Sequence, residues 1–409
     1  RRPRTVEPIP MGPDIAFAFE LPVQIRFGVG RVRDLAAVLA AHGRPRILLA
    51  APGWCLDGAG PSGAVLDALR GAASAVVPLR LGDGEPTSHE VDAGAALARR
   101  EGVALVVGVG GGAAVDTAKA IAAMAPREEP VELYLEGVGD GRVLDRPGLP
   151  CVAVPTTAGT GAEVTRNAVI ANPGKRYKRS LRSLLVLPRV AVVDPALAVS
   201  APPGVTAASG IDAIVQLIEP YVSRKAQPIT DALAAQAIPE AAAALPRAVR
   251  DGGDLAARAV MAKAALYSGV CLSHAGLGVV HALASVVGAF TSMPHGVVCA
   301  RLGAEAIRAN ARALARVEGP SGSDPLARLA QVGRWVTGAS TGDALGDALA
   351  GADRMAELVE TRGVPRFRTY GVMEADVETI LAAPLGGGMK TNPAELDRVA
   401  IGRIVRSGM

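Results

Sequence analysis

An uncharged stretch of the chain carries three histidines. Residues 264–300 contain no Asp, Glu, Lys or Arg, although Lys263 and Arg301 flank them directly. Imidazole exchanges protons near neutral pH and is also a common metal ligand. We therefore interpret this stretch as the buried wall of a reaction chamber, with three candidate groups, His274, His281 and His295.

A second polar pair lies upstream, in a segment with helical periodicity. Asp212 and Gln216 are four residues apart, which places both on one helix face among apolar neighbours such as Ile211 and Leu217. A carboxylate buried among apolar side chains is costly unless it is paired or binds a cation. A buried cap or another satisfied polar contact is the structural alternative, and the pattern leaves both open.

Three consecutive glycines follow an apolar run and open a helical segment. Gly110, Gly111 and Gly112 would let the backbone approach a pyrophosphate, and the helix N-terminus would present free N–H groups to it. A tight turn needed only for packing is the alternative, but the run at a strand-to-helix junction favours phosphate binding. Asp116 and Lys119 lie on one face of the same helix and either pair with each other or contact the cofactor.

A loop of small hydroxyl residues follows the next apolar run. The loop contains three threonines, Thr156, Thr157 and Thr160, and two glycines, Gly159 and Gly161. The threonine hydroxyls could donate hydrogen bonds to ribose or phosphate oxygens. Thr and Gly are also common in ordinary turns. The loop therefore supports a nucleotide site only in combination with the glycines.

The elements that would position these groups change character along the chain. The stretch AFAFELPVQIRFGVG at 16–30, with alternation around Phe17, Phe19, Leu21 and Val23, predicts a strand or two at a sheet edge. Apolar runs and helical segments then alternate as far as residue 194, which is typical of a parallel sheet wrapped by helices. After Pro202 and Pro203 the pattern is helical. We expect a disordered tail over residues 1–14, an α/β domain over 15–200 and a helical domain over 201–409.

Composition excludes several classes of function. The net charge is only +4 in 409 residues, and aromatic residues make up 3% of the chain, so a nucleic-acid surface is not expected. The cysteines are scattered without a C-x-x-C pair, which favours a reducing cytoplasm over a disulfide framework. Residues 264–300 are long enough to span a membrane, but histidines, serines and Pro294 interrupt them, so we predict a buried helical hairpin.

Several motifs together resemble the iron-containing (group III) alcohol dehydrogenase family. They occur in the family's order, as GGG with D-x-x-K at 110–119, PTTAGTGAEVT at 155–165, DPALAVSAPP at 194–203, GIDA at 210–213, GLGVVHALA at 276–284, MPHG at 293–296 and GMKTNP at 388–393. The resemblance implies a Rossmann-like N-terminal domain with a parallel sheet, an all-α C-terminal domain, and a cleft between them. In that cleft NAD or NADP would meet a divalent metal, usually iron or zinc.

The resemblance also implies a ligand set, and this chain departs from it. The family's metal positions fall on Asp212, Gln216, His281 and His295, so a carboxamide stands where the family has a histidine. A neutral amide oxygen is a weak ligand for iron or zinc, so we expect weaker metal binding. The family's proton-relaying histidine is replaced by Ser285, which could pass a proton along a chain. His274 is expected to be packed rather than catalytic.

Cofactor choice is open from the sequence. The acidic residue that often holds the ribose of NAD after the first Rossmann strand is absent, since Ala50, Ala51 and Pro52 stand there, and this permits NADP. The family pattern places Lys178 near the cofactor, with a solvated surface charge as the alternative.

The sequence therefore predicts an NAD(P)-dependent alcohol dehydrogenase, a cytoplasmic homodimer or larger homo-oligomer acting by metal-assisted hydride transfer. Its substrate would be a small-molecule or peptide alcohol or carbonyl compound, and a specialised natural-product hydroxyl is one such substrate. Three alternatives stay open: a metal-independent reductase of the maleylacetate reductase kind, a lyase related to dehydroquinate synthases, and a catalytically inactive cofactor-binding partner.

Overall fold

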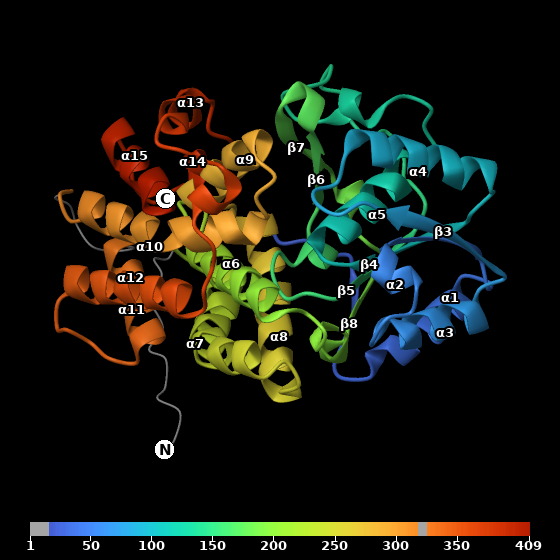
Figure 1. Cartoon of the computed structure of the whole chain (residues 1–409), viewed down its shortest axis with the longest axis horizontal. Helices are drawn as coiled ribbons and strands as arrows, with labels where there is room; N and C mark the ends of the chain where they lie inside the picture. Colours follow the sequence, from blue (N-terminus) through green and yellow to red (C-terminus); the bar gives the residue numbers. More distant parts are fainter. Residues whose placement is uncertain (1–15, 318–324) are drawn as a thin grey trace.

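The computed structural model describes residues 16–317 and 325–409 of the chain. The predicted disordered tail over residues 1–14 lies outside these described residues. The remaining chain forms a sheet-containing half, drawn at the right of Figure 1, and a helical half at its left.

The N-terminal half is built on a six-stranded sheet with the order β1-β8-β5-β4-β2-β3, and every pairing in it is parallel. Its strands are long apolar runs because helices cover both faces. They are β1 (Gln24–Phe27), β2 (Arg46–Pro52), β3 (Ala75–Leu81), β4 (Leu105–Gly110), β5 (Cys151–Pro155) and β8 (Val190–Val193). The predicted parallel sheet is confirmed.

Alternate residues of each strand point to opposite faces, and each face has its own helices. On β2, Leu49 packs with α1 and α3, whereas Leu48 packs with α5. A separate antiparallel hairpin of β6 and β7 packs against α5. The elements of this half not yet given are α1 (Asp34–Ala41), α2 (Gly53–Leu56), α3 (Ser62–Ala72), α4 (Ser88–Arg100), α5 (Gly112–Met124), β6 (Asn167–Asn172) and β7 (Tyr177–Arg182).

Of the strand or two predicted over residues 16–30, one is confirmed as β1 at the edge of the sheet, whereas the alternating residues from Phe17 to Val23 form no strand. Residues 16–23 are extended without strand pairing. The alternating apolar residues are buried against a helix instead of a sheet. Phe19, Leu21 and Val23 pack against the helix that carries His274. The backbone N–H and carbonyl of Glu20 both face the His274 ring rather than another strand.

The second half begins where α6 starts at Pro203, and in its described residues it contains helices and no strand. A continuous apolar core joins its helices. They are α6 (Pro203–Val222), α7 (Pro228–Arg250), α8 (Leu255–Ala275), α9 (Val279–Phe290), α10 (His295–Leu314), α11 (Pro325–Thr337), α12 (Ala344–Thr361), α13 (Asp376–Ala382), α14 (Gly388–Thr391) and α15 (Arg398–Ser407). The predicted helical C-terminal region is confirmed.

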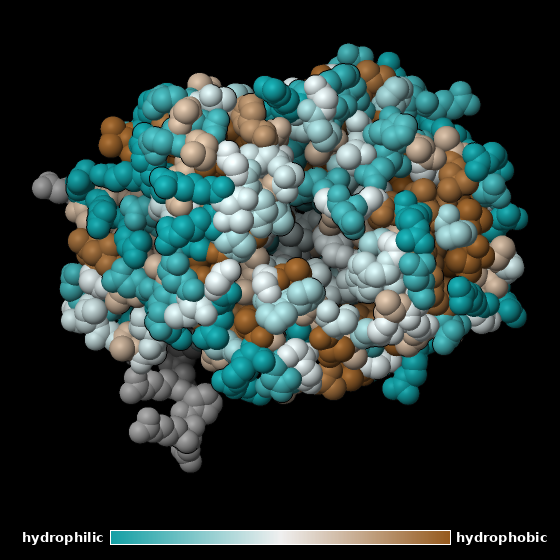
Figure 2. All heavy atoms as spheres, viewed as in Figure 1, coloured by the Kyte–Doolittle hydropathy of each residue, from teal (hydrophilic) through white to brown (hydrophobic). Residues whose placement is uncertain are grey.

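The uncharged stretch 264–300 is buried, but it is not a simple hairpin. It contains the end of α8, all of α9 and the start of α10. Within the described residues, α8 is the helix long and apolar enough to cross a membrane, yet 61% of its apolar window is buried inside the protein. It packs against α6 and α7. On the face shown in Figure 2, the surface is hollowed between the two halves.

Candidate active site

Four side chains from three helices of the second half converge on one point, three of them buried and His295 half-buried. Asp212 comes from the middle of α6, His281 from the first turn of α9, and His295 and Cys299 from the first two turns of α10. One ligand atom from each lies within 4.8 Å of the others. His281 Nε2 is 3.3 Å from Asp212 Oδ1, and Cys299 Sγ is 3.6 Å from His295 Nε2. The structure thus brings three of the four predicted metal residues together with an unpredicted cysteine.

Glu219 fixes which nitrogen of His281 faces the cluster. The Nδ1–H of His281 donates to Glu219 Oε2 at 2.7 Å, so in the neutral ring Nε2 carries the lone pair. That lone pair faces the carboxylate of Asp212. Neither His281 Nε2 nor Asp212 Oδ1 has a hydrogen-bond partner within the described chain, although both are buried. Two acceptors facing each other in the interior require a cation or a proton between them.

The charges around the cluster agree with that requirement. Burial alone would raise the pKa of Asp212, but His295 and His281 beside it bring it below its usual value. Burial opposes protonation of His281, yet Cys299, Asp212 and Glu219 raise its pKa well above the ordinary value. Burial and the nearby Lys178 lower the pKa of His295 to about 4, so this imidazole is neutral and has a lone pair to offer a metal.

The first turn of α9 is held in place by side chains from two other segments. Val280 N–H donates to Glu219 Oε1 at 2.7 Å, and Val279 N–H donates to Asn392 Oδ1 at 3.1 Å. These bonds satisfy N–H groups that a helix start otherwise leaves unpaired. A Cβ at Gly278 would lie 2.8 Å from Glu219 Oε1, so glycine is needed there. Glu219 therefore orients His281 in two ways: it accepts a hydrogen bond from the imidazole ring, and it accepts one from the backbone of the helix turn that carries His281.

Gln216 faces the N-terminal half of the protein. Its amide nitrogen donates to the carbonyl of Thr160 at 2.7 Å and to the hydroxyl of Ser268 at 2.8 Å. Both hydrogens of the amide are therefore used, and the nitrogen side of the group ties α6 to the threonine loop and to α8. Its predicted role as a metal ligand stays a prediction.

The predicted glycine and threonine motifs meet at the carboxyl end of β4. Gly110 has a φ of +147°, which only glycine adopts readily, and its carbonyl accepts from the N–H of Thr156 at 2.8 Å. A Cβ on Gly112 would lie 2.6 Å from Thr160 Oγ1, and one on Gly111 would lie 3.4 Å from Thr157 Oγ1. The N-terminus of α5 has no side-chain cap. This arrangement suits an anionic phosphate.

Asp116 pairs with Lys119, the first of its two predicted alternatives. Lys119 Nζ donates to Asp116 Oδ1 at 2.9 Å, and the other carboxylate oxygen accepts from Val169 N–H at 2.9 Å. Lys119 is fully buried and also donates to Thr165 Oγ1 and two backbone carbonyls. The pair thus ties α5 to the strand that follows the threonine loop.

Lys178 is not a solvated surface charge, because its side chain is only 3% exposed. It stands on β7 and donates to Glu85 Oε1 at 2.7 Å. A Cβ on Gly288 of α9 would lie 3.4 Å from its Nζ, so the lysine reaches the helical half. Its charge also acts on His295, so it lies beside the metal cluster. Its contact with the cofactor stays a prediction.

The two remaining predicted residues have clear hydrogen-bond partners. Ser285 lies one turn after His281 on α9, is half-buried, and donates to the carbonyl of His281 at 3.1 Å. Nothing in these contacts tests its predicted catalytic role. His274 stacks on Phe19 with ring centroids 4.0 Å apart and bonds to the carbonyl of Val270 at 2.8 Å. Its predicted structural role is confirmed.

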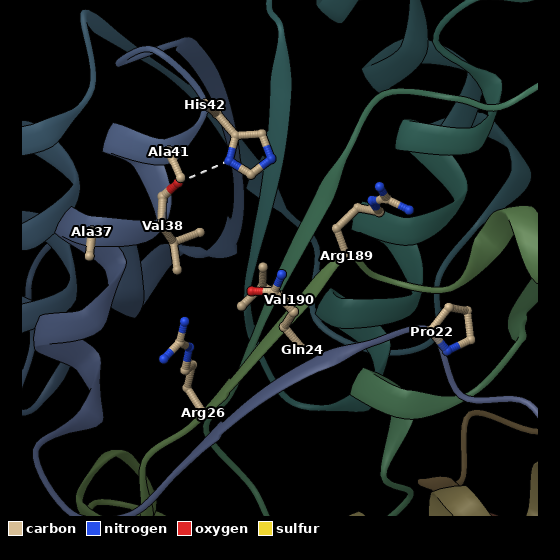
Figure 3. Close-up of a pocket in the computed structure, with 9 residues that line it drawn as sticks. All are labelled: Pro22, Gln24, Arg26, Ala37, Val38, Ala41, His42, Arg189 and Val190. Carbon is tan, nitrogen blue, oxygen red and sulfur yellow. Dashed lines mark hydrogen bonds between the residues drawn. The ribbon is translucent and has the colours of Figure 1, made fainter.

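A separate hollow of about 310 Å³ lies at the opposite end of the sheet (Figure 3). Gln24 and Val190, the first residues of β1 and β8, line it together with Arg26 and His42. His42 is held by the carbonyl of Val38 at 2.9 Å. Parallel α/β sheets bind ligands at the carboxyl ends of their strands, whereas this hollow is at the amino ends. It contains none of the clustered groups, and we assign it no role.

Comparison with known families agrees with the fold of both halves. Residues 22–195 match the family model "Iron-containing alcohol dehydrogenase", and residues 206–409 match "Fe-containing alcohol dehydrogenase family, C-terminal". The chain belongs to the iron-containing alcohol dehydrogenase family. It is thus an oxidoreductase of the alcohol dehydrogenase type, and its family is NAD(P)-dependent and contains a metal.

Individual relatives span almost all of the chain. Choline dehydrogenase of Bacillus subtilis (strain 168) is 34% identical over 363 residues, which cover 88% of this chain and 87% of the relative. NAD-dependent methanol dehydrogenase of Bacillus methanolicus is 33% identical over 364 residues, covering 88% and 91%. The crystal structure of a 1,3-propanediol oxidoreductase superposes with a TM-score of 0.87 at 32% identity, covering 97% of this chain and all of that one.

The residues of this family member fit a divalent cation. The fit rests on the facing lone pairs of Asp212 and His281 and on the neutral His295, a donor set suited to iron or zinc. Sequence reasoning missed Glu219 and Cys299. Both could have been found, because Glu219 lies two helical turns after Asp212, and Cys299 lies one turn after His295.

Proposed function

We propose that this chain is a metal-assisted NAD(P)-dependent alcohol dehydrogenase whose reaction takes place between the glycine cradle and the Asp212 cluster. The supporting observation is the pair of buried acceptors, Asp212 Oδ1 and His281 Nε2, which face each other at 3.3 Å. A protein that had lost its metal chemistry would not be expected to retain such a costly arrangement. This argues for an active metal site over the metal-independent and inactive alternatives.

In the proposed reaction, the alcohol carbon gives a hydride to the nicotinamide and the hydroxyl loses a proton, leaving a carbonyl. A divalent cation bound at the cluster would polarise the substrate oxygen, and the nicotinamide would accept the hydride. Asp212, His281 and His295 would hold the cation. The backbone N–H groups at the start of α5 and the hydroxyls of Thr157 and Thr160 would bind the cofactor phosphates and ribose.

Lys178 and Ser285 have supporting roles in this proposal. Lys178, fixed by Glu85, closes the site between β7 and α9 and orients the cofactor. Ser285 accepts the hydroxyl proton through a chain of hydrogen bonds and passes it to solvent. A hydroxyl can relay a proton but cannot store one near neutral pH, so turnover should rise with pH as external base becomes available.

The cofactor preference follows from the end of β2. A Cβ on Gly110 would lie 3.1 Å from Pro52 Cδ, so the end of β2 adjoins the phosphate cradle. Gly53 follows Pro52 in the chain. Because Gly53 has no side chain, the guanidinium of Arg80 fits against it, and a Cβ there would displace that guanidinium. β2 itself carries no ribose-binding carboxylate. Arg80 pairs with Asp57 Oδ1 at 2.8 Å, and by turning from that exposed carboxylate it would accommodate a 2′-phosphate. We therefore propose that NADP is used at least as well as NAD.

Substrates are proposed to be small primary alcohols, following the names of the relatives, which include choline, methanol and 1,3-propanediol. A larger natural-product or peptide hydroxyl stays a prediction. The test is a panel of these alcohols with each cofactor, followed by the absorbance of reduced nicotinamide, before and after chelation and metal return. Metal-independent turnover would contradict the mechanism, and absence of reduced nicotinamide with every alcohol would contradict the activity.

A further inference from the structure

We infer that Cys299 is a metal ligand and supplies a thiolate to the cation held by Asp212, His281 and His295. The inference deepens the proposed function and rests on it, because it presumes that this cluster binds a metal. It does not depend on which alcohol is oxidised.

The position of Cys299 on α10 directs its sulfur into the cluster. It lies four residues after His295, so both side chains project from one face of the helix. The residue is fully buried, and its Sγ is 3.6 Å from His295 Nε2. It also lies close enough to Asp212 and His281 to interact with both.

Close packing of two helices brings this sulfur to Asp212. A Cβ on Gly303 would lie 2.7 Å from Val215 Cγ2, and one on Gly296 would lie 3.2 Å from the backbone of Ala208. Both glycines therefore allow α10 to approach α6 closely. Because Cys299 lies between them on α10, its side chain reaches the same space as that of Asp212.

The distances agree with the edges of a tetrahedral site. Bonds of about 2.0 Å to nitrogen or oxygen and about 2.3 Å to sulfur place two light-atom ligands about 3.3 Å apart, and sulfur about 3.6 Å from nitrogen. In this structure His281 Nε2 and Asp212 Oδ1 are 3.3 Å apart, and Cys299 Sγ and His295 Nε2 are 3.6 Å apart. These two edges already have the length of a tetrahedral site, and all four ligand atoms lie within 4.8 Å of one another, so a cation would draw them together over a short distance.

Cys271 provides a comparison, because it is a buried thiol outside the cluster. Cys271 is also fully buried, and its sulfur contacts the carbonyl of Thr230 on a neighbouring helix. Among the described residues, Cys299 is the one cysteine in a group with two histidines and a carboxylate. Burial raises the pKa of both thiols well above its ordinary value, to about 12 for Cys299, so each is protonated without a cation. Metal binding at Cys299 would release that proton to solvent.

Gln216 complements this arrangement. Its amide nitrogen is held by Thr160 and Ser268, and a carboxamide oxygen is a weak ligand for iron or zinc. A thiolate from α10 compensates for the imidazole that α6 lacks. Since thiolates favour zinc over harder cations, the site should prefer zinc.

The test uses cobalt(II) in place of the native metal, because a thiolate bound to cobalt gives an intense charge-transfer band in the near ultraviolet. The purified full-length protein is freed of metal by chelation, titrated with cobalt(II), and examined by absorption spectroscopy and equilibrium dialysis. We expect one cobalt per chain with the charge-transfer band, and the same band in Gln216→Ala. In Cys299→Ala the band should be lost and the cobalt affinity should fall by about tenfold or more, at least the loss typical of removing an outer-shell partner.

Cys271→Ala is the matched control, since it removes an equally buried thiol outside the cluster, and it should keep the band. Cys299→Ser tests for misfolding, because it keeps a side chain of similar size but lacks the sulfur. Bound cobalt without the band in the wild-type protein would overturn the inference and leave the proposed function standing. Failure of the wild-type protein to bind cobalt or zinc at all would overturn the metal-assisted function itself.

Discussion

Replacing Glu219 by glutamine should weaken metal binding although the residue touches no metal. Glu219 accepts from Val280 N–H with one oxygen and from His281 Nδ1–H with the other, both at 2.7 Å. A carboxamide has one accepting oxygen and one donating nitrogen. If the oxygen stays with Val280, the amide N–H faces Nδ1 of His281 and moves the ring proton to Nε2, where the metal should bind. The opposite orientation puts two donors against each other at Val280.

The magnitude follows from the role of such outer partners. Loss of a hydrogen-bond partner behind a metal-bound histidine costs about 10- to 100-fold in metal affinity, or about 1.4–2.7 kcal/mol. The Glu219→Gln change should fall at the upper end, because the carboxylate orients both the ring and the first turn of its helix. The change in side-chain volume is negligible, so the packing around the site is retained.

The assay is competition for zinc between the metal-free protein and a chromophoric chelator, with thermal denaturation as a check on folding. Glu240→Gln is the control, because that carboxylate lies partly exposed on α7, pairs with Lys263, and is outside the cluster. The control should bind zinc like the wild-type protein. Unchanged zinc affinity in a folded Glu219→Gln variant would refute the role given to Glu219.

Three further predictions concern other parts of the chain. Asp116→Asn should lower the unfolding free energy by about 3–5 kcal/mol, because it leaves the buried charge of Lys119 unpaired, whereas cofactor affinity in the folded variant should not change. Calorimetry and cofactor titration separate the two effects, and weaker cofactor binding at full stability would reassign Asp116 to the cofactor. Arg80→Gln should weaken NADP binding by about tenfold or more while sparing NAD, since a hydrogen bond to a charged group is worth about 1.5–3 kcal/mol; equal loss for both cofactors would contradict the 2′-phosphate site. Asp347→Asn should destabilise the protein by about 2 kcal/mol at neutral pH. Burial alone would raise the pKa of Asp347, but its hydrogen bonds lower it from the ordinary 3.8 to about 2. The stabilisation by this carboxylate is therefore complete above about pH 4 and is lost as pH falls toward 2. A stability difference from the wild-type protein that does not shrink over that range would contradict the assignment.

The fold was predictable because its sequence signals are local and repeated. Apolar runs alternating with helical segments predicted the parallel sheet, and the change of pattern after Pro202 coincides with the start of α6. The segment 16–23 was mispredicted for a physical reason. Alternating apolar residues indicate that one face of a segment is buried, but not which groups its backbone pairs with. At Glu20 the backbone contacts the ring of His274 instead of a neighbouring strand.

The sequence predicted the residues of the candidate site that stand out by type and spacing. It did not predict those whose role depends on contacts between different helices. The spacing of His281 and His295 and the buried carboxylate of Asp212 were visible in the sequence. Glu219 and Cys299 share helix faces with Asp212 and His295, so helical spacing makes them candidates. Their contacts with His281 and with the cluster depend on how α6, α9 and α10 pack together, which no local pattern records.

The two closely packed helices explain how a ligand can change without loss of the site. Asp212 and Gln216 are four residues apart on α6, and His295 and Cys299 are four residues apart on α10. On α10 both residues reach the cluster, whereas on α6 Asp212 reaches it and the amide nitrogen of Gln216 is held by Thr160 and Ser268. A donor missing from α6 can therefore be supplied by α10. Exchanging a neutral imidazole for a thiolate adds a negative charge, so a divalent cation would be neutralised by Asp212 and Cys299 together. Such a cation withdraws less electron density from a substrate oxygen, and proton removal then depends more on the base that receives the proton. With Ser285 unable to store that proton, the alcohol oxidation rate of this chain should increase with both pH and buffer concentration.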